Sequence, residues 1–158
     1  MFRLNVLVET GTFSGETIAA TRGYFTEIYS IELSPELHLL AKQRFAGVPR
    51  VHLLLGNSGE VLTEILRALP QKALFWLDAH YSGGSTARGP TDTPIIQELE
   101  TILALHEDSV VLIDDARLFD GSNSYPTLAE LADYVAKRAP DSVLEVKHDI
   151  IRLHRRLD

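Results

Sequence analysis

Short apolar runs alternate with segments of helical spacing along most of the chain. The runs are rich in Val, Ile and Leu, and they predict buried strands at residues 4–9, 27–33, 51–55, 73–77 and 109–113. Between them, apolar residues recur every three or four positions, which predicts helices at residues 16–24, 35–45, 61–69 and 94–106. Because strands and helices alternate, we expect a parallel sheet with helices on both faces.

The last part of the chain breaks this alternation. A predicted helix ending near Arg138 is followed by two apolar runs, 143–146 and 150–154, with only a short turn containing His148 and Asp149 between them. A connection this short cannot hold a helical crossover, so these two strands must pair antiparallel. The sequence therefore predicts one α/β domain over residues 1–158. It would be a doubly wound, mostly parallel seven-stranded sheet whose C-terminal antiparallel hairpin adds a reversed strand at one edge.

The first predicted strand runs into a loop that contains Gly11 and Gly15. A strand, a tight loop and a helix N-terminus allow the backbone to approach a small ligand closely. The two glycines are not spaced as G-x-G-x-x-G, and no Lys follows as in a P-loop, which weakens nicotinamide and nucleoside-triphosphate interpretations. Glu9 comes just before the loop, where a phosphate would be repelled. We therefore expect a nucleoside cofactor whose charged centre is a cation.

Five of the predicted strands end in polar side chains, mostly acids. A single such residue can be a turn former or a helix cap. The carboxyl ends of parallel strands meet at one edge, however, so together they favour a site there. Glu32 lies roughly 20 residues beyond the glycine loop, where an acid can accept both hydroxyls of a ribose. Its alternative role is a carboxylate at a helix N-terminus. The strand-end residues are Glu9, Glu32, Asn57, Asp78 and the pair Asp114-Asp115.

The amino-acid composition limits which kinds of binding partner the protein can have. The formal net charge is −7, which argues against a nucleic-acid partner because phosphate binding needs a basic face. The chain has no cysteine, which excludes disulfides, thiolate catalysis and thiolate metal sites. No run approaches the roughly 18 apolar residues of a membrane span. We expect a cytoplasmic protein with a small-molecule substrate and no membrane partner, and a homo-oligomer stays open.

The segment Glu9–Gly15, E-T-G-T-F-S-G, resembles motif I of the class I S-adenosylmethionine-dependent methyltransferases, although it lacks the usual middle glycine. Ile31-Glu32-Leu33 resembles the acidic segment that follows motif I, and Gly56-Asn57-Ser58 resembles the segment that lies against the adenine. The reversed last strand is also typical of that fold, so the resemblance covers essentially the whole chain. It implies a Rossmann-like fold and S-adenosylmethionine as cofactor. The implied cofactor-binding residues are Glu9, Thr10, Gly11, Thr12, Phe13, Gly15, Glu32, Asn57, Ser58 and Asp78.

A finer resemblance is to metal-dependent O-methyltransferases that modify macrolide sugars and aminocoumarin antibiotics. In that group an Asp after the fourth strand and an Asp-Asp pair after the fifth bind magnesium, and the matching positions here are Asp78 and Asp114-Asp115. His80 stands where the group has its general base, so His80 and Asp78 are the implied catalytic residues. Three carboxylates brought together would also favour a hard cation such as Mg²⁺ on general grounds. In the alternative, Asp115 belongs to the following turn and only Asp114 faces the site.

Three functional hypotheses follow. The first is an S-adenosylmethionine-dependent methyltransferase that acts, with metal assistance, on an oxygen of a small hydroxylated molecule. The second is a non-catalytic member of the same fold that binds only the cofactor or a partner. The third is a NAD-dependent oxidoreductase, which lacks its glycine motif here. Substrate specificity would lie in the loops at residues 81–93 and 117–125.

Overall fold

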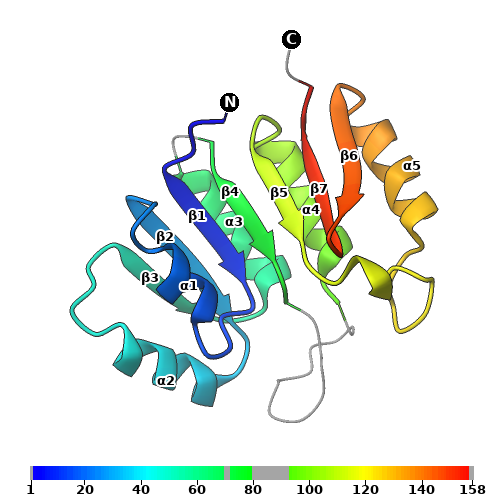
Figure 1. Cartoon of the computed structure of the whole chain (residues 1–158). Coiled ribbons are helices and arrows are strands. Elements are labelled where there is room, and N and C mark those ends of the chain that lie inside the picture. The colour runs from blue at the N-terminus through cyan, green and yellow to red at the C-terminus, as the bar shows by residue number, and fades with distance from the viewer. Residues whose placement is uncertain (1, 70–71, 80–92, 157–158) are drawn as a thin grey trace.

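A single seven-stranded sheet organises the chain, with the strand order β3-β2-β1-β4-β5-β7-β6 (Figure 1). The computed structural model describes residues 2–69, 72–79 and 93–156. Strands β1 to β5 are parallel, and only β7 runs in reverse. The strands are β1 (Val6–Thr10), β2 (Glu27–Glu32), β3 (Val51–Leu55), β4 (Leu74–Leu77), β5 (Val110–Ile113), β6 (Ser142–Lys147) and β7 (Ile150–Arg155). The predicted α/β class is confirmed.

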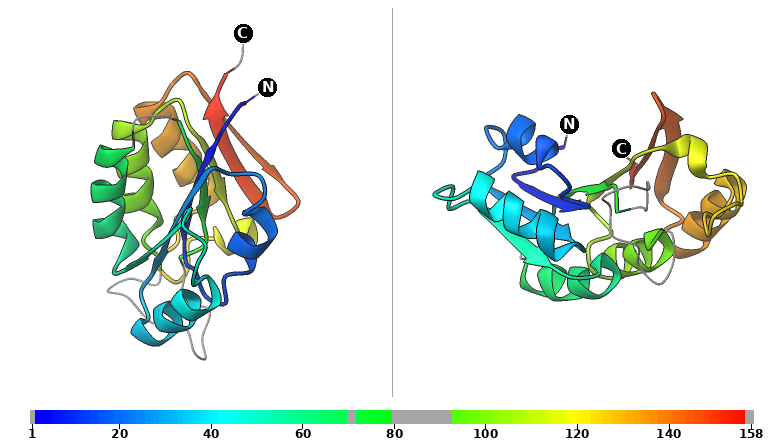
Figure 2. Two further views of the ribbon diagram at one scale, coloured as in Figure 1. Left: turned by 90° about the vertical axis from the view of Figure 1, so that its left-hand side faces the viewer. Right: turned by 90° about the horizontal axis from the view of Figure 1, so that it is seen from below.

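Helices cover both faces of this sheet, as Figure 2 shows, and their positions agree with the predicted ones to within a few residues. In the part of the chain that the structure describes, no helix is long and apolar enough to cross a membrane. The helices are α1 (Glu16–Thr21), α2 (Pro35–Arg44), α3 (Ser58–Ala68), α4 (Ile95–Leu105) and α5 (Leu128–Arg138), with a 3₁₀ turn η1 (Ala116–Leu118) after β5.

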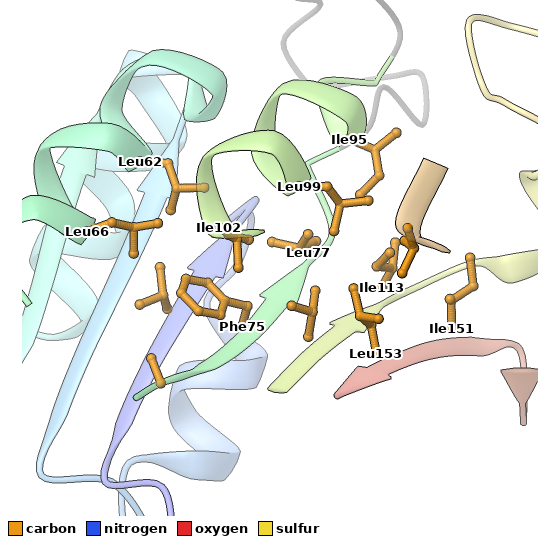
Figure 3. Close-up of a cluster of buried hydrophobic side chains, with 14 of the residues drawn as sticks. Leu62, Leu66, Phe75, Leu77, Ile95, Leu99, Ile102, Ile113, Ile151 and Leu153 are labelled. Carbon is orange, nitrogen blue, oxygen red and sulfur yellow. The ribbon is translucent and has the colours of Figure 1, made fainter. Parts of the chain in front are cut away.

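The core lies in two layers because successive strand side chains point to opposite faces. On one face, side chains from α3 and α4 point toward Phe75 and Leu77 of β4 (Figure 3). On the other face, Ile18 of α1 packs with Leu7 of β1 and with Phe45, which follows α2. All five residues of β1 are buried, since this central strand is covered on both sides.

The C-terminal hairpin confirms one prediction and corrects a detail of it. His148 and Asp149 form its turn with φ values of 54° and 63°, and β6 pairs antiparallel with β7. The reversed strand was expected at the edge of the sheet, but β7 lies inside it, against β5. Burial explains this order, because Ile151 and Leu153 of β7 belong to the main core whereas the last half of β6 is exposed.

The end of β1 lies between the ends of β2 and β4, with Thr10 in register with Ile31 and Leu77. The neighbours of β1 are β2 and β4, so the order in which strands join the sheet reverses at β1, and in such sheets ligands bind in the crevice at this point. The backbone N–H of Gly11 donates to the carbonyl of Ile31 at 2.9 Å. A Cβ on Gly11 would lie 2.5 Å from the carbonyl oxygen of Asp78, and its φ of 86° favours glycine. Only a glycine lets these strand ends meet.

Replacing Gly11 by Ala should therefore destabilise the protein by about 2 to 3 kcal/mol, because strain and overlap add at one site. Urea unfolding would measure the loss. Gly23→Ala is the matched control, since nothing lies within 4 Å of its Cβ position. That control should change the free energy of unfolding by less than about 0.5 kcal/mol. Equal effects of the two substitutions would contradict this account of Gly11.

Candidate functional site

Glu32, at the end of β2, fastens the glycine loop to the start of α2. Its Oε2 accepts a hydrogen bond from the backbone N–H of Phe13 at 2.8 Å, and its Oε1 accepts one from the N–H of Ser34 at 2.8 Å. Each carboxylate oxygen has further lone pairs that a hydroxyl donor can use. The geometry thus fits an acid that holds the loop and could also accept ribose hydroxyls, and the ribose role stays a prediction.

Glu9 lies beneath the same loop in a chain of polar contacts. Ser30 donates to Glu9 Oε2 at 2.5 Å, and Thr12 is 2.6 Å from Ser30 as the next member of the chain. Glu9 is only 1% exposed, and this burial raises its pKa to about 7 despite the hydrogen bonds of Ser30 and Thr17. The charges of Asp78 and Glu32 raise the pKa further. The three acids share one electrostatic environment, which favours a cation.

The remaining residues of segment 9–15 differ in where their side chains lie. Thr12 is buried beside Ser30, whereas the Phe13 side chain is 51% exposed at the surface of the loop. Gly15 begins α1 with a φ of 78°, and a Cβ there would lie 2.6 Å from the Phe45 ring. Thr10, the last residue of β1, is fully buried, and its side chain lies on the face of the sheet that α3 and α4 cover, beside Glu98.

The segment after β3 starts a helix. Asn57 is the N-cap of α3 and accepts a hydrogen bond from the N–H of Gly59 at 3.0 Å. Ser58 is 5% exposed, and its hydroxyl lies beside the carboxyl of Glu98. A polar residue after β3 was interpreted as part of a site, and Asn57 at this position also has the structural role of a helix N-cap. The adenine contact implied for Asn57 and Ser58 stays a prediction.

A hollow forms where β4 and β5 end, and Asp78 and Asp114 both line it. The strand ends are joined there, because the N–H of Asp114 donates to the carbonyl of Leu77 at 3.1 Å. We call this feature the β4–β5 hollow. Its described lining residues are Leu77, Asp78, Ala79, Thr93, Ile95, Glu98, Ile113, Asp114, Phe119 and Tyr125.

Asp115 does not line this hollow. It has a φ of 56° and begins the η1 turn, and its Oδ1 pairs with Arg117 at 2.7 Å. Arg117 also pairs with Asp149 in the hairpin turn. Among the described residues, no group of three His, Asp or Glu side chains could hold a metal ion. The three-aspartate magnesium site is therefore not assembled by these residues, and the alternative in which Asp115 belongs to the turn agrees with the geometry.

His80, the implied general base, lies outside the described residues, as does the loop from residue 81 to residue 92. Its catalytic role stays a prediction.

Glu98 of α4 is a site residue that the sequence analysis missed. It is 1% exposed, and burial raises its pKa to about 7 although the hydroxyls of Ser58 and Thr10 oppose the rise. Its Oε1 has no hydrogen-bond partner among the described residues. A sequence signal existed, because Glu98 falls on the apolar stripe that Ile95, Leu99 and Ile102 form along this helix.

The raised pKa of Glu98 makes stability depend on pH. In the unfolded chain this carboxyl loses its proton near pH 4.5, but in the folded protein it keeps the proton until about pH 7. The folded state therefore binds more protons in this window, and stability falls as the pH rises through it. Glu98→Gln should remove up to about 3 kcal/mol of the decline between pH 5 and pH 8.

Urea unfolding at several pH values would test this expectation. Glu9 contributes a similar decline and stays in place, so part of the slope should persist in the variant. Glu64→Gln, on the exposed face of α3, is the control and should leave the slope unchanged. An unaltered slope in Glu98→Gln would show that this carboxyl is already ionised at low pH.

Comparison with known proteins bears on the fold. No family model matches the sequence, and no curated protein does. A methyltransferase of Podospora anserina, PaMTH1 bound to SAH (S-adenosylhomocysteine), aligns with a TM-score of 0.61 at 19% identity, covering 97% of this chain and 72% of that one. An rRNA methylase of Streptococcus thermophilus aligns with a TM-score of 0.60 at 12% identity, over 98% of this chain and 88% of that one.

A third solved structure, a candidate caffeoyl-CoA O-methyltransferase of Staphylococcus aureus, aligns with a TM-score of 0.61 at 15% identity, over 96% of this chain and 76% of that one. The names of the second and third proteins refer to different methyl acceptors, rRNA and caffeoyl-CoA, so the acceptor does not follow from the likeness. At such low identity the likeness concerns architecture alone. The chain has the Rossmann-like α/β fold of class I S-adenosylmethionine-dependent methyltransferases.

Proposed function

We propose that this protein is an S-adenosylmethionine-dependent methyltransferase. The observation that carries the proposal is the cluster of Glu9, Glu32 and Asp78 around the glycine loop, at the switch point of a methyltransferase fold. A sulfonium centre is cationic, and carboxylates stabilise a cation where they would repel a phosphate. Glu32 also fits this cofactor, because its carboxylate accepts a hydrogen bond from the loop and has further lone pairs that could accept the ribose hydroxyls.

S-adenosylmethionine would supply an electrophilic methyl group, and the protein would mainly align donor and acceptor. Glu32 would hold the ribose while it keeps the loop in place through Phe13 and Ser34. Glu9 and Asp78 would supply negative potential to the cofactor beside the end of β1. The β4–β5 hollow, which borders Asp78, would receive the acceptor.

We propose a hydroxyl of a small molecule as the acceptor, in the cytoplasm. The net charge of −7 supports a small substrate over a nucleic acid. The acid-lined hollow suits a polar molecule, and His80 is the proposed base that takes the hydroxyl proton. The NAD-dependent alternative has no support in the glycine pattern.

Assistance by magnesium is a more specific hypothesis than methyl transfer itself. The described residues offer the oxygen ligands that Mg²⁺ prefers, but fewer of them than the three aspartates expected. Asp78 and Asp114 offer carboxylates, whereas Asp115 is paired with Arg117. We derive no step through a metal ion.

Calorimetry with S-adenosylhomocysteine tests the cofactor assignment. The wild-type protein should bind it, and Glu32→Gln should weaken binding roughly ten- to a hundredfold, because charge-assisted hydrogen bonds are lost. Glu36→Gln, an exposed acid on α2, is the control and should bind like the wild type. Absence of binding at millimolar ligand, or binding of NAD in its place, would remove the proposal.

Chelation tests the metal hypothesis. S-adenosylhomocysteine production from S-adenosylmethionine, followed across a panel of hydroxylated small molecules, should survive EDTA because Asp115 is held by Arg117. Loss of turnover in EDTA with recovery in Mg²⁺ would instead establish the metal. A protein that binds the cofactor but turns over no acceptor would support the non-catalytic alternative.

A further inference from the structure

The β4–β5 hollow combines carboxyl groups with aromatic rings. Asp78, Glu98 and Asp114 line it from β4, α4 and β5, whose ends lie together in the fold (Figure 1). Phe119 and Tyr125 line it as well, and their rings meet edge to face with centroids 5.1 Å apart. None of its described lining residues is basic.

Glu98 gives this hollow an unmet hydrogen-bonding demand. A buried polar atom without a partner costs free energy, and the large majority of buried side-chain polar atoms therefore have one. Glu98 is 1% exposed, yet its Oε1 has no partner among the described residues. The neighbouring hydroxyls of Ser58 and Thr10 oppose the rise of its pKa without cancelling it. A ligand in the hollow can supply what the protein does not.

An ammonium group matches this environment better than a neutral donor. It carries three N–H donors and a positive charge, and aromatic rings attract cations. It would also favour ionised Glu98, opposing the burial that raises the pKa of this carboxyl to about 7.

Arg117, a cation that follows β5, is paired with Asp115 and Asp149. The described carboxyls form no metal-binding group, and an ammonium contacts oxygen at about 2.8 Å rather than the roughly 2.1 Å of Mg²⁺.

We propose that the β4–β5 hollow binds a protonated amine, so that the methyl acceptor is a small amino alcohol whose ammonium group lies among Asp78, Glu98 and Asp114. This rests on the proposed methyltransferase function. The amine, held protonated, has no lone pair, and the methyl group goes to the hydroxyl oxygen instead. The C–S bond breaks with its electron pair passing to sulfur, a C–O bond forms, and the hydroxyl proton leaves to a base.

A matched pair of probes tests the proposal. The protein, saturated with S-adenosylhomocysteine, is titrated at pH 7.5 with trans-2-aminocyclohexanol and, separately, with trans-cyclohexane-1,2-diol, which differs only in the amine. Amide shifts in NMR spectra report the affinities and the location. The amino alcohol should bind at least about tenfold more tightly than the diol, with shifts around α4 and the end of β5. Glu98→Gln should abolish this preference, and Glu64→Gln should keep it.

Equal affinity for the two probes, binding of neither, or an undiminished preference in Glu98→Gln would overturn the proposal. The comparison in the wild-type protein needs no variant, so it decides even if Glu98→Gln does not fold. Failure of the methyltransferase assignment is a separate result: it appears as absence of S-adenosylhomocysteine binding in the first step. The two probes can then be compared without the cofactor, and a tenfold preference for the amine would still support the hollow as an ammonium site.

Discussion

The close approach of Gly11 to the carbonyl of Asp78 is the constraint on which the site depends. It brings the ends of β1 and β4 together with no room for a side chain, while the same residue donates to the carbonyl of Ile31 in β2. Side chains at the ends of three strands are thereby gathered at one edge of the sheet. Because they include Glu9, Glu32 and Asp78, the geometry concentrates negative charge at the place where this fold binds ligands.

That charge is organised in two neighbouring regions. Around the glycine loop, Glu32 holds backbone N–H groups and Glu9 ends a buried chain of hydroxyls. Beyond Asp78, the β4–β5 hollow adds Asp114 and Glu98. Two carboxyls, Glu9 and Glu98, have their pKa raised to about 7 by burial, so each costs stability when it ionises and can recover that cost only beside a cation. Both regions are therefore suited to positively charged ligands.

The sequence predicted what local patterns control. Short apolar runs located the strands, apolar positions recurring every three or four residues located the helices, and the rule for parallel strands placed Asp78 and Asp114 at one edge. It could not predict features decided by distant residues. Asp115 is removed from the hollow by Arg117, which is fixed by Asp149 from the hairpin 32 residues later. Glu98 stood in an apolar helical stripe, but only the tertiary fold shows the hollow beside it.

The central claim is that the acids around Gly11 hold a cationic nucleoside cofactor. A crystal structure of the protein with S-adenosylhomocysteine tests it most directly. The account predicts that the ribose hydroxyls contact Glu32 and that the sulfur lies near Glu9 and Asp78, with the β4–β5 hollow left open beside it. A complex whose nucleoside lies away from the Gly11 loop, or whose ribose does not contact Glu32, would contradict it.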